Sequence, residues 1–263
     1  MKKPVFEGVA TALVTPFKQG TLDFAVMNQL LDLQLAAGVD AVVVCGTTGE
    51  ASTMTDNEKL ALIAHTVKYC AGRCRVIAGT GTNDTAHTLQ LSRVAASMGV
   101  DAVLLVTPYY NKPSQEGLYQ HFRTVSEHSP LPVILYNIPG RTGVNMTSET
   151  TLRIARDFEN VIGVKEASGD IEQMQRILDN RPEGFLVLSG DDGITIPLMR
   201  RGGDGVISVV ANVFPERFMS CVNHAKAGDF DTAEREYAQL DEAVKALFEE
   251  GNPVGVKCAL SVM

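Results

Sequence analysis

Eight short apolar runs, rich in β-branched residues, alternate with amphipathic helical patterns along this chain. Parallel strands need helical crossovers between them, so this alternation predicts a parallel sheet. The runs are apolar throughout rather than at every second position, which indicates that both faces of each strand are buried. Eight such units match a (β/α)8 TIM barrel. The expected strands span residues 8–16, 41–47, 75–79, 102–109, 132–138, 161–167, 185–190 and 205–211.

A short glycine motif recurs before two of the expected strands. Segments 37–41 and 98–102 both contain Gly-Val-Asp-Ala. Glycine suits the left-handed residue that ends a helix, so the repeat supports the count of barrel units. Further helical patterns at 215–227 and 230–249 exceed what a barrel needs. We therefore expect a catalytic barrel over residues 1–213 and a C-terminal helical region over residues 214–263.

The composition argues against several classes of protein. Apolar residues make up 45% of the 263 residues and charged residues 21%, which is typical of a globular protein with a large core. The net charge of −8 and the lack of a basic stripe argue against a nucleic-acid partner. No apolar run is long enough to span a membrane, and the N-terminus lacks the apolar core of a signal peptide. The odd count of five cysteines argues against a disulfide framework, so we expect a cytoplasmic location.

The sequence contains no pattern for a metal or a nucleotide. The histidines are scattered among helical neighbours, so we expect them on solvated faces. Asp191 and Asp192 follow the seventh expected strand, where a turn and a helix N-cap account for them. Residues 79–83 lack the third glycine of a dinucleotide fingerprint. We therefore expect a site that uses no metal and no cofactor.

One lysine interrupts the sixth expected strand. Lys165 lies within VIGVKEAS at residues 161–168, and buried strands rarely contain lysine. If the side chain points inward, desolvation disfavours its charged form and leaves the amine free to act as a nucleophile. Alternatively, Lys165 only marks the solvated end of the strand. This stretch alone does not decide between the two.

Polar side chains also follow other strands, at the barrel end where (β/α)8 enzymes have their active sites. Tyr136, one strand away from the lysine, can carry the protons that a lysine nucleophile must exchange. Thr47 and Thr48 lie between glycines, where hydroxyl and backbone N–H groups can bind a carboxylate. Arg141 offers two parallel hydrogen bonds to a second carboxylate. Each also has a simpler explanation: a barrel tyrosine, a glycine-rich turn and a surface arginine.

Three motifs together strongly resemble the dihydrodipicolinate synthase family, the pyruvate-dependent class I aldolases that also include N-acetylneuraminate lyase. The motifs are GTTGE at residues 46–50, YNIPGRTG at 136–143 and GVKEASG at 163–169. Each motif is modest alone, but their order and spacing are specific. The resemblance continues through LSGDD at 188–192 and GVISV at 205–209 to the end of the chain.

The resemblance implies that Lys165 forms a Schiff base with pyruvate. Tyr136 would donate and accept protons, linked to Thr48 and Tyr110 in a relay, with Thr47 beside them. In the family, the residue that matches Tyr110 reaches into the site of a neighbouring subunit. A homo-oligomer is therefore implied, at least a dimer and typically a tetramer.

The resemblance also implies the substrate contacts. Thr48, Gly190 and Ile207 would bind pyruvate through hydroxyl and backbone groups. Arg141 would hold the carboxylate of L-aspartate-4-semialdehyde at the mouth of the site. The implied reaction turns the Schiff base into an enamine that attacks the aldehyde, and the adduct cyclises as Lys165 is released. This is a step of diaminopimelate and lysine biosynthesis.

Two rival functions remain open. A sibling lyase or sugar-acid aldolase would share the Schiff-base chemistry. The lyase branch usually has Ser-Thr at positions 47–48 and lacks arginine at position 141, so both positions favour the synthase. A non-catalytic barrel with a binding or regulatory role is the second rival, but such a copy would be free to lose Lys165, Tyr136, Thr48 or Tyr110.

Two departures from the family concern regulation and length. Lys59 and His87 stand where lysine-inhibited members have histidine and glutamate in their lysine pocket. A second cation would repel the lysine ammonium, and loss of the carboxylate removes its partner, so we expect weak or absent lysine inhibition.

The chain also ends short of the usual family length, so we expect a short C-terminal helical appendage.

Overall fold

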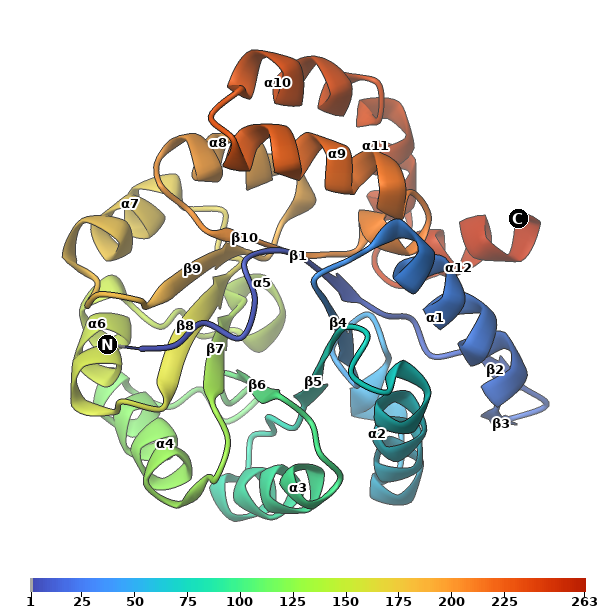
Figure 1. The fold of residues 1–263 in the computed structure, drawn as a ribbon. Coiled ribbons are helices and arrows are strands. Elements are labelled where there is room, and N and C mark those ends of the chain that lie inside the picture. The colour runs from blue at the N-terminus through green and yellow to red at the C-terminus, as the bar shows by residue number, and fades with distance from the viewer. Residues whose placement is uncertain (1) are drawn as a thin grey trace.

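The computed structural model describes residues 2–263 and contains a closed barrel of parallel strands. The (β/α)8 barrel expected from the sequence is confirmed, and Figure 1 shows its helices arranged around the strands. Neighbouring strands follow the order β1 (Gly8–Ala12), β10 (Gly205–Ser208), β9 (Leu186–Ser189), β8 (Val161–Glu166), β7 (Val133–Asn137), β6 (Ala102–Val106), β5 (Arg75–Gly79) and β4 (Ala41–Val44).

The helices of the outer ring begin mostly at side-chain caps. An Asp, Ser or Thr side chain accepts hydrogen bonds from the first free N–H groups of six helices, which stabilises each helix start. Thr55 and Glu58 form a reciprocal capping box at one of these ends. The ring consists of α1 (Phe24–Ala37), α2 (Asp56–Cys70), α3 (Thr85–Ser97), α4 (Gln115–His128), α6 (Ser148–Asp157), α7 (Ile171–Asn180), α8 (Thr195–Arg200) and α9 (Pro215–Lys226).

Further helices follow the ring at the C-terminal end of the chain. Helix α10 (Phe230–Ala238) packs on α9, and Figure 1 shows it outside α8 and α9. The helical pattern over 230–249 is two helices, because α10 ends before Gln239 and α11 (Asp241–Glu249) starts after Leu240. Helix α12 (Val254–Val262) packs on α11. Helix α9 contacts both β1 of the barrel and α10 of the C-terminal region. The division into a barrel over residues 1–213 and a C-terminal helical region over residues 214–263 therefore stays a prediction.

Several expected strands were too long at their carboxyl ends, and small elements follow in the connections to the next helices. The runs 8–16 and 102–109 stop as strands at Ala12 and Val106, before Pro16 and Pro108, and the run 205–211 stops at Ser208. The connections contain a hairpin and short helical turns: β2 (Phe17–Lys18), β3 (Thr21–Leu22), η1 (Ala51–Thr53), α5 (Pro139–Thr142), η2 (Asp192–Ile194) and η3 (Val210–Asn212).

Alternate residues of each strand fill the barrel or pack under the helices. The interior cluster contains Ala10, Ala12, Ala41, Val43, Ile77, Ala102, Leu104, Ile134, Tyr136, Leu186, Leu188 and Ile207. The residues between them along the strands join two larger clusters with the helices. Both faces of the strands are therefore buried, as the apolar runs predict.

Strand β8 contains one irregularity of register that matters for the site. Ile134 of β7 pairs with Gly163, so one residue of β8 is unmatched at this point. Ile162 packs in the barrel interior, whereas Val164 packs outward against helices. A bulge of this kind re-aims the residues that follow it. The side chain of Lys165 consequently faces the interior.

One expectation about titratable residues is wrong. His121 does not lie on a solvated face; only 5% of its surface is exposed, and its Nδ1 lies 2.8 Å from the Thr85 hydroxyl. Burial lowers the pKa of His121 to about 4. The residues around His121 in the sequence suggested an exposed position, but packing of α4 against α3 covers its side chain.

All five cysteines are free. None of the helices within residues 2–263 has the length and hydrophobicity needed to cross a membrane.

We expect Gly163→Ala to destabilise the barrel. A Cβ at this position would lie 2.7 Å from the Cβ of Leu186 and 2.9 Å from its carbonyl oxygen, so the β8–β9 pair must shift. Overpacking of this kind costs about 1–3 kcal/mol. Chemical denaturation would measure the loss. Gly140→Ala is the matched control, since its Cβ meets nothing within 4 Å, and an equal loss in both variants would contradict the explanation.

Candidate active site

The carboxyl ends of β7 and β8 bring an amine and a phenol together. Lys165 and Tyr136 are partners in the sheet register, and the ammonium nitrogen lies 4.5 Å from the centroid of the tyrosine ring. Only 5% of Lys165 and 4% of Tyr136 are exposed. A buried primary amine next to a tyrosine can attack a carbonyl group and exchange protons during imine formation.

Gly190 makes room for the lysine side chain. A Cβ on Gly190 would lie 3.0 Å from Cε of Lys165 and 2.6 Å from Cβ of Ala167, so a larger residue would collide with both. Its backbone N–H donates to the Glu166 carbonyl at 2.8 Å, which ties the end of β9 to β8. Ile207 lies in β10, where it is 1% exposed and packs in the barrel interior.

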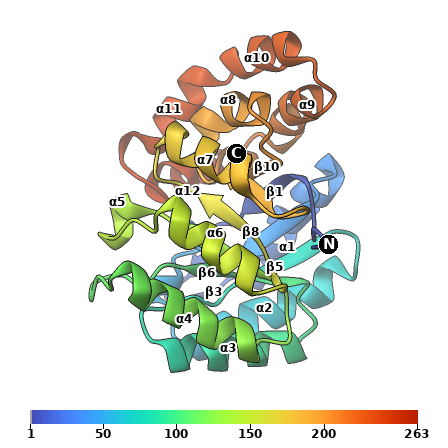
Figure 2. The same cartoon turned by 90° about the vertical axis from the view of Figure 1, so that its left-hand side faces the viewer.

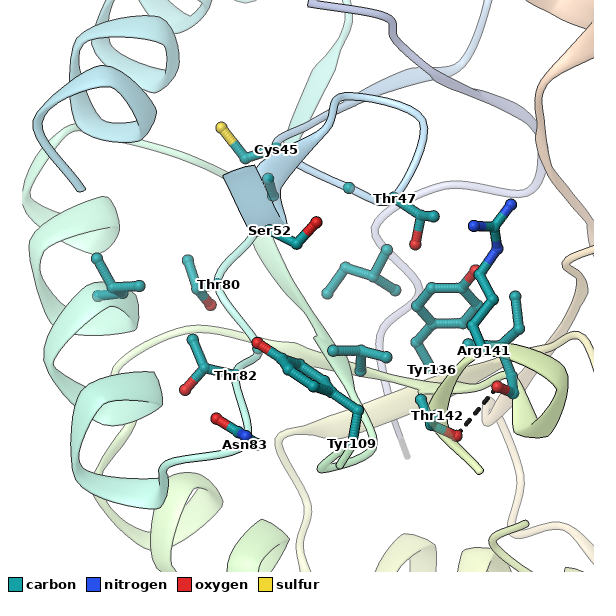
Figure 3. Close-up of a pocket in the computed structure, with 18 of the residues that line it drawn as sticks. Cys45, Thr47, Ser52, Thr80, Thr82, Asn83, Tyr109, Tyr136, Arg141 and Thr142 are labelled. Carbon is teal, nitrogen blue, oxygen red and sulfur yellow. Dashed lines mark hydrogen bonds between the residues drawn. The ribbon is translucent and has the colours of Figure 1, made fainter. Parts of the chain in front are cut away.

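The loop after β4 carries Thr47 and Thr48. Thr48 is 2% exposed, whereas Thr47 is half-buried and lines a cavity at this end of the barrel. The hydroxyl of Thr15 donates to the Gly49 carbonyl at 2.7 Å and holds the loop against the segment after β1. Figure 3 shows Thr47 on the same side of the cavity as Tyr136.

The other two predicted residues lie farther out. Arg141, in the short helix α5, is exposed at the mouth, and its Nη2 donates to the backbone carbonyl of Asn252 at 2.9 Å. The side chain of Tyr110 does not lie with the other predicted site residues of this chain. It is 88% exposed and has a φ of 71°, although its neighbour Tyr109 lines the cavity.

A cavity of about 340 Å³ opens among these residues. Figure 3 shows Tyr136, Thr47 and Arg141 at one side of it and Thr82 and Asn83 at the other. Lys165 is not among the lining residues; it meets the cavity through Tyr136, whose ring its ammonium faces. The volume suits a small-molecule ligand.

The two residues expected to weaken lysine inhibition also line this cavity. Lys59 Nζ lies 3.3 Å from Asp56 Oδ1, and His87 Nε2 lies 2.7 Å from Asp56 Oδ2. The hydrogen bond to His87 is the largest cause that lowers the pKa of Asp56. One carboxylate at the start of α2 therefore bridges both basic side chains.

A buried carboxylate lies directly behind the lysine. Glu166 is fully buried and points to the opposite face of β8, where its oxygens accept hydrogen bonds from the side-chain amides of Asn137 (3.0 and 3.1 Å) and Gln173 (3.0 Å) and from the Ser168 backbone N–H (2.9 Å). Burial raises the pKa of Glu166, and these neutral donors oppose that rise. The network joins β7, β8 and α7 at the height of Lys165.

A second buried carboxylate joins the ends of β9 and β10. Asp191 acts as the expected cap, accepting from the Gly193 backbone N–H at 2.8 Å. Asp192 instead turns inward and is 2% exposed. Its Oδ2 accepts from the backbone N–H groups of Val209 and Val210 at 3.0 and 3.2 Å, so it holds the loop after Ile207. Burial raises the pKa of Asp192, and the positive charge of Lys165 is among the influences that oppose this rise.

The sequence analysis missed contacts made by the segment between α11 and α12. Asn252 Nδ2 donates to Thr48 Oγ1 at 2.9 Å, and Lys257 Nζ donates to the Thr15 carbonyl at 3.0 Å and pairs with Glu50. No local pattern around Asn252 could have indicated the contact with Thr48, because the two residues lie 204 positions apart in the sequence.

Within residues 2–263, no group of three His, Cys, Asp or Glu side chains is arranged to hold a metal ion.

Comparisons with known proteins agree on one family. The model of the Dihydrodipicolinate synthetase family matches residues 5–263. The curated 4-hydroxy-tetrahydrodipicolinate synthase of Parabacteroides distasonis is 49% identical over 258 residues, which cover 98% of this chain and 87% of the relative.

Solved structures are similar over the same extent. The dihydrodipicolinate synthase of Thermotoga maritima superposes with a TM-score of 0.97 at 45% identity, covering 98% of this chain and 89% of that one. A structure described as the first monomeric dihydrodipicolinate synthase variant gives 0.96 at 46% identity, covering 98% and 87%. Since the family model and these relatives match nearly all of it, the chain belongs to the dihydrodipicolinate synthetase family.

Proposed function

We propose that this chain is a 4-hydroxy-tetrahydrodipicolinate synthase, a Schiff-base lyase that condenses pyruvate with L-aspartate-4-semialdehyde in diaminopimelate and lysine biosynthesis. The observation that carries the proposal is the buried Lys165 facing the ring of Tyr136 at the carboxyl end of the barrel. Membership of the family and the printed function of the similar relatives support the choice of substrates.

The covalent steps follow from the amine and its neighbours. The lone pair of the Lys165 nitrogen attacks C2 of pyruvate, and loss of water leaves an imine. The imine accepts electrons when a methyl proton is removed, which gives an enamine. The enamine carbon forms a bond to the aldehyde carbon of the semialdehyde. The amine of the adduct then attacks the imine carbon, closes the ring and releases Lys165. We assign the proton transfers to Tyr136, in a relay with Thr48 and Tyr110 and with Thr47 beside it.

The binding roles follow from the positions of the remaining residues. We infer that Thr48, Gly190 and Ile207 hold pyruvate, since Gly190 lies against Lys165 and the other two are buried at the same barrel end. Arg141 is assigned to the carboxylate of the semialdehyde, because its guanidinium is exposed at the mouth. The protonated imine is itself the electron sink, so the reaction requires neither metal nor other cofactor.

We infer a homo-oligomer, at least a dimer and in the usual family form a tetramer. The support is Tyr110, an aromatic side chain that is 88% exposed and assigned to the proton relay, yet lies outside the site of its own chain. A second copy of the chain would bury the ring of Tyr110 and would take the Tyr110 hydroxyl into its own active site. We also infer a cytoplasmic location, which fits five free cysteines.

Reduction with borohydride in the presence of pyruvate tests the function. We expect a single reduced pyruvate adduct, found on Lys165 by peptide mass mapping, and none in Lys165→Ala. No adduct on Lys165 would contradict both the synthase and the sibling lyase. Turnover with L-aspartate-4-semialdehyde, but not with N-acetylneuraminate, would then distinguish the synthase from the lyase. Adduct formation also distinguishes an enzyme from a non-catalytic barrel.

We expect Tyr136→Phe to lower kcat by roughly 10²-fold or more, because general acid–base catalysis by one side chain contributes about 10²–10⁴-fold. The ring that packs against Lys165 is retained, so the fold and the unfolding temperature should change little. Tyr69→Phe is the matched control, since its hydroxyl bonds to Asp32 on the outer helices. Steady-state kinetics would measure the effect, and a kcat within about twofold of wild type would remove Tyr136 from the relay.

We expect L-lysine to inhibit weakly or not at all, because Lys59 brings a second cation that repels the ammonium of the ligand, and Asp56 is already paired with Lys59 and His87. Inhibition would be measured at saturating pyruvate. The double variant Lys59→His with His87→Glu is the control that should gain inhibition. An inhibition constant in the micromolar range for the wild-type chain would refute this expectation.

A further inference from the structure

We propose that Glu166 is a positioning residue: by holding the ends of β7 and β8 together, it sets how Lys165 and Tyr136 lie relative to each other. This inference rests on the proposed function, in which Lys165 is the nucleophile and Tyr136 carries protons. Glu166 itself is not among the residues that line the cavity. Its side chain lies on the helix side of β8, where Figure 2 shows α6 and α7 side by side and where α6 contacts the strand.

The contact between the two reacting side chains does not fix their separation. The ammonium of Lys165 lies over the ring of Tyr136, 4.5 Å from its centroid. A cation is attracted to a ring face anywhere within about 6 Å of the centroid, so this contact tolerates displacement. The two side chains therefore take their relative position from the backbones of β7 and β8, which pair at these residues.

The next pair along the same ladder faces the helices. Asn137 pairs with Glu166, one step beyond the reacting pair and at the end of both strands. Side chains alternate along a strand, so this pair points outward, and both side chains are fully buried. One peptide unit on each strand separates the outward pair from the reacting pair. A shift within the outward pair consequently moves the reacting pair as well.

The carboxylate of Glu166 is surrounded by hydrogen-bond donors. Asn137 Nδ2 lies 3.0 and 3.1 Å from its two oxygens, Gln173 Nε2 lies 3.0 Å from Oε2, and the Ser168 backbone N–H donates to Oε1 at 2.9 Å. An ionised carboxylate only accepts, so it satisfies all three neighbours at once. An amide of the same shape would replace one of these acceptors by a donor.

The amide of Asn137 cannot turn to suit such a change. Its Oδ1 accepts from the Met146 backbone N–H at 3.0 Å, which fixes Nδ2 toward Glu166. Because Nδ2 lies close to both carboxylate oxygens, the new NH2 group of Glu166→Gln would face it in either orientation. Two donors without an acceptor between them cost stability, so the ends of the two strands would move apart.

The test measures the reacting pair without the second substrate. With pyruvate alone in heavy water, the enzyme should exchange the methyl protons of pyruvate through the enamine, and borohydride reduction counts the Lys165 sites that form the imine. We expect Glu166→Gln to form one adduct per chain but to exchange about 10-fold more slowly per site, because misplacing a reacting group by about 1 Å can cost up to about 10²-fold. A role in folding alone would reduce the number of sites and leave the rate per site unchanged.

Moving the carboxylate across the same contact tests the origin of the loss. Asn137→Asp alone sets two carboxylates against each other, so we expect it to slow exchange by about 10-fold as well. In the double variant Asn137→Asp with Glu166→Gln, an amide again donates to a carboxylate, and Met146 keeps its acceptor. We expect this variant to exchange at least about threefold faster than either single variant, since residues in direct contact couple.

A milder variant serves if Glu166→Gln does not fold. Gln173→Leu removes one donor from the carboxylate and changes neither strand, so we expect exchange about threefold slower per site, the loss of one hydrogen bond. Gln175→Leu on the same helix is the matched control, because its amide donates to Asp179 at the surface. The control should exchange at the wild-type rate, and equal rates in the two variants would overturn the inference.

The outcomes distinguish this inference from the proposed function. If wild type forms no pyruvate adduct on Lys165, the proposed function fails and the inference fails with it. If the adduct forms and Glu166→Gln exchanges at the wild-type rate per site, only the inference is overturned. A double variant as slow as the single variants would also overturn it, because the loss would then not arise from the contact between Asn137 and Glu166.

Discussion

The site depends on the pairing of β7 with β8 that places Lys165 beside Tyr136. The unmatched residue before Gly163 turns the lysine inward, and the ring of Tyr136 faces its ammonium, with both side chains largely buried. Gly163 and Gly190 permit this arrangement, since a side chain at either would collide with β9 or with Lys165. The chemistry and the strand packing therefore rest on the same few contacts.

Two buried carboxylates hold the strands that carry the reacting groups. Glu166 joins β7, β8 and α7 through amide donors, and Asp192 joins the end of β9 to the loop after β10. Burial raises the pKa of both carboxyl groups, and each accepts hydrogen bonds from neutral amide or backbone donors. Strand alternation explains Glu166: a residue next to an inward lysine must point outward into the helical layer.

The C-terminal helical region takes part in the site rather than only covering the barrel. Through Asn252 it reaches Thr48 and Arg141, and through Lys257 it holds the loops after β1 and β4. A segment distant in sequence thus connects the residues assigned to the two substrates. Changes in this region are expected to alter turnover as well as stability.

The sequence by itself determined the number and order of the strands and the polar residues at their ends, because hydrophobic period and chain order are local properties. It also identified the family through three short motifs. Tertiary structure alone decided that Lys165 faces inward, since a register irregularity depends on a neighbouring strand. It likewise buried His121 and Asp192, and it brought Asn252 to Thr48 across 204 residues. Contacts at such separation arise from barrel closure and helix docking, which no local pattern encodes.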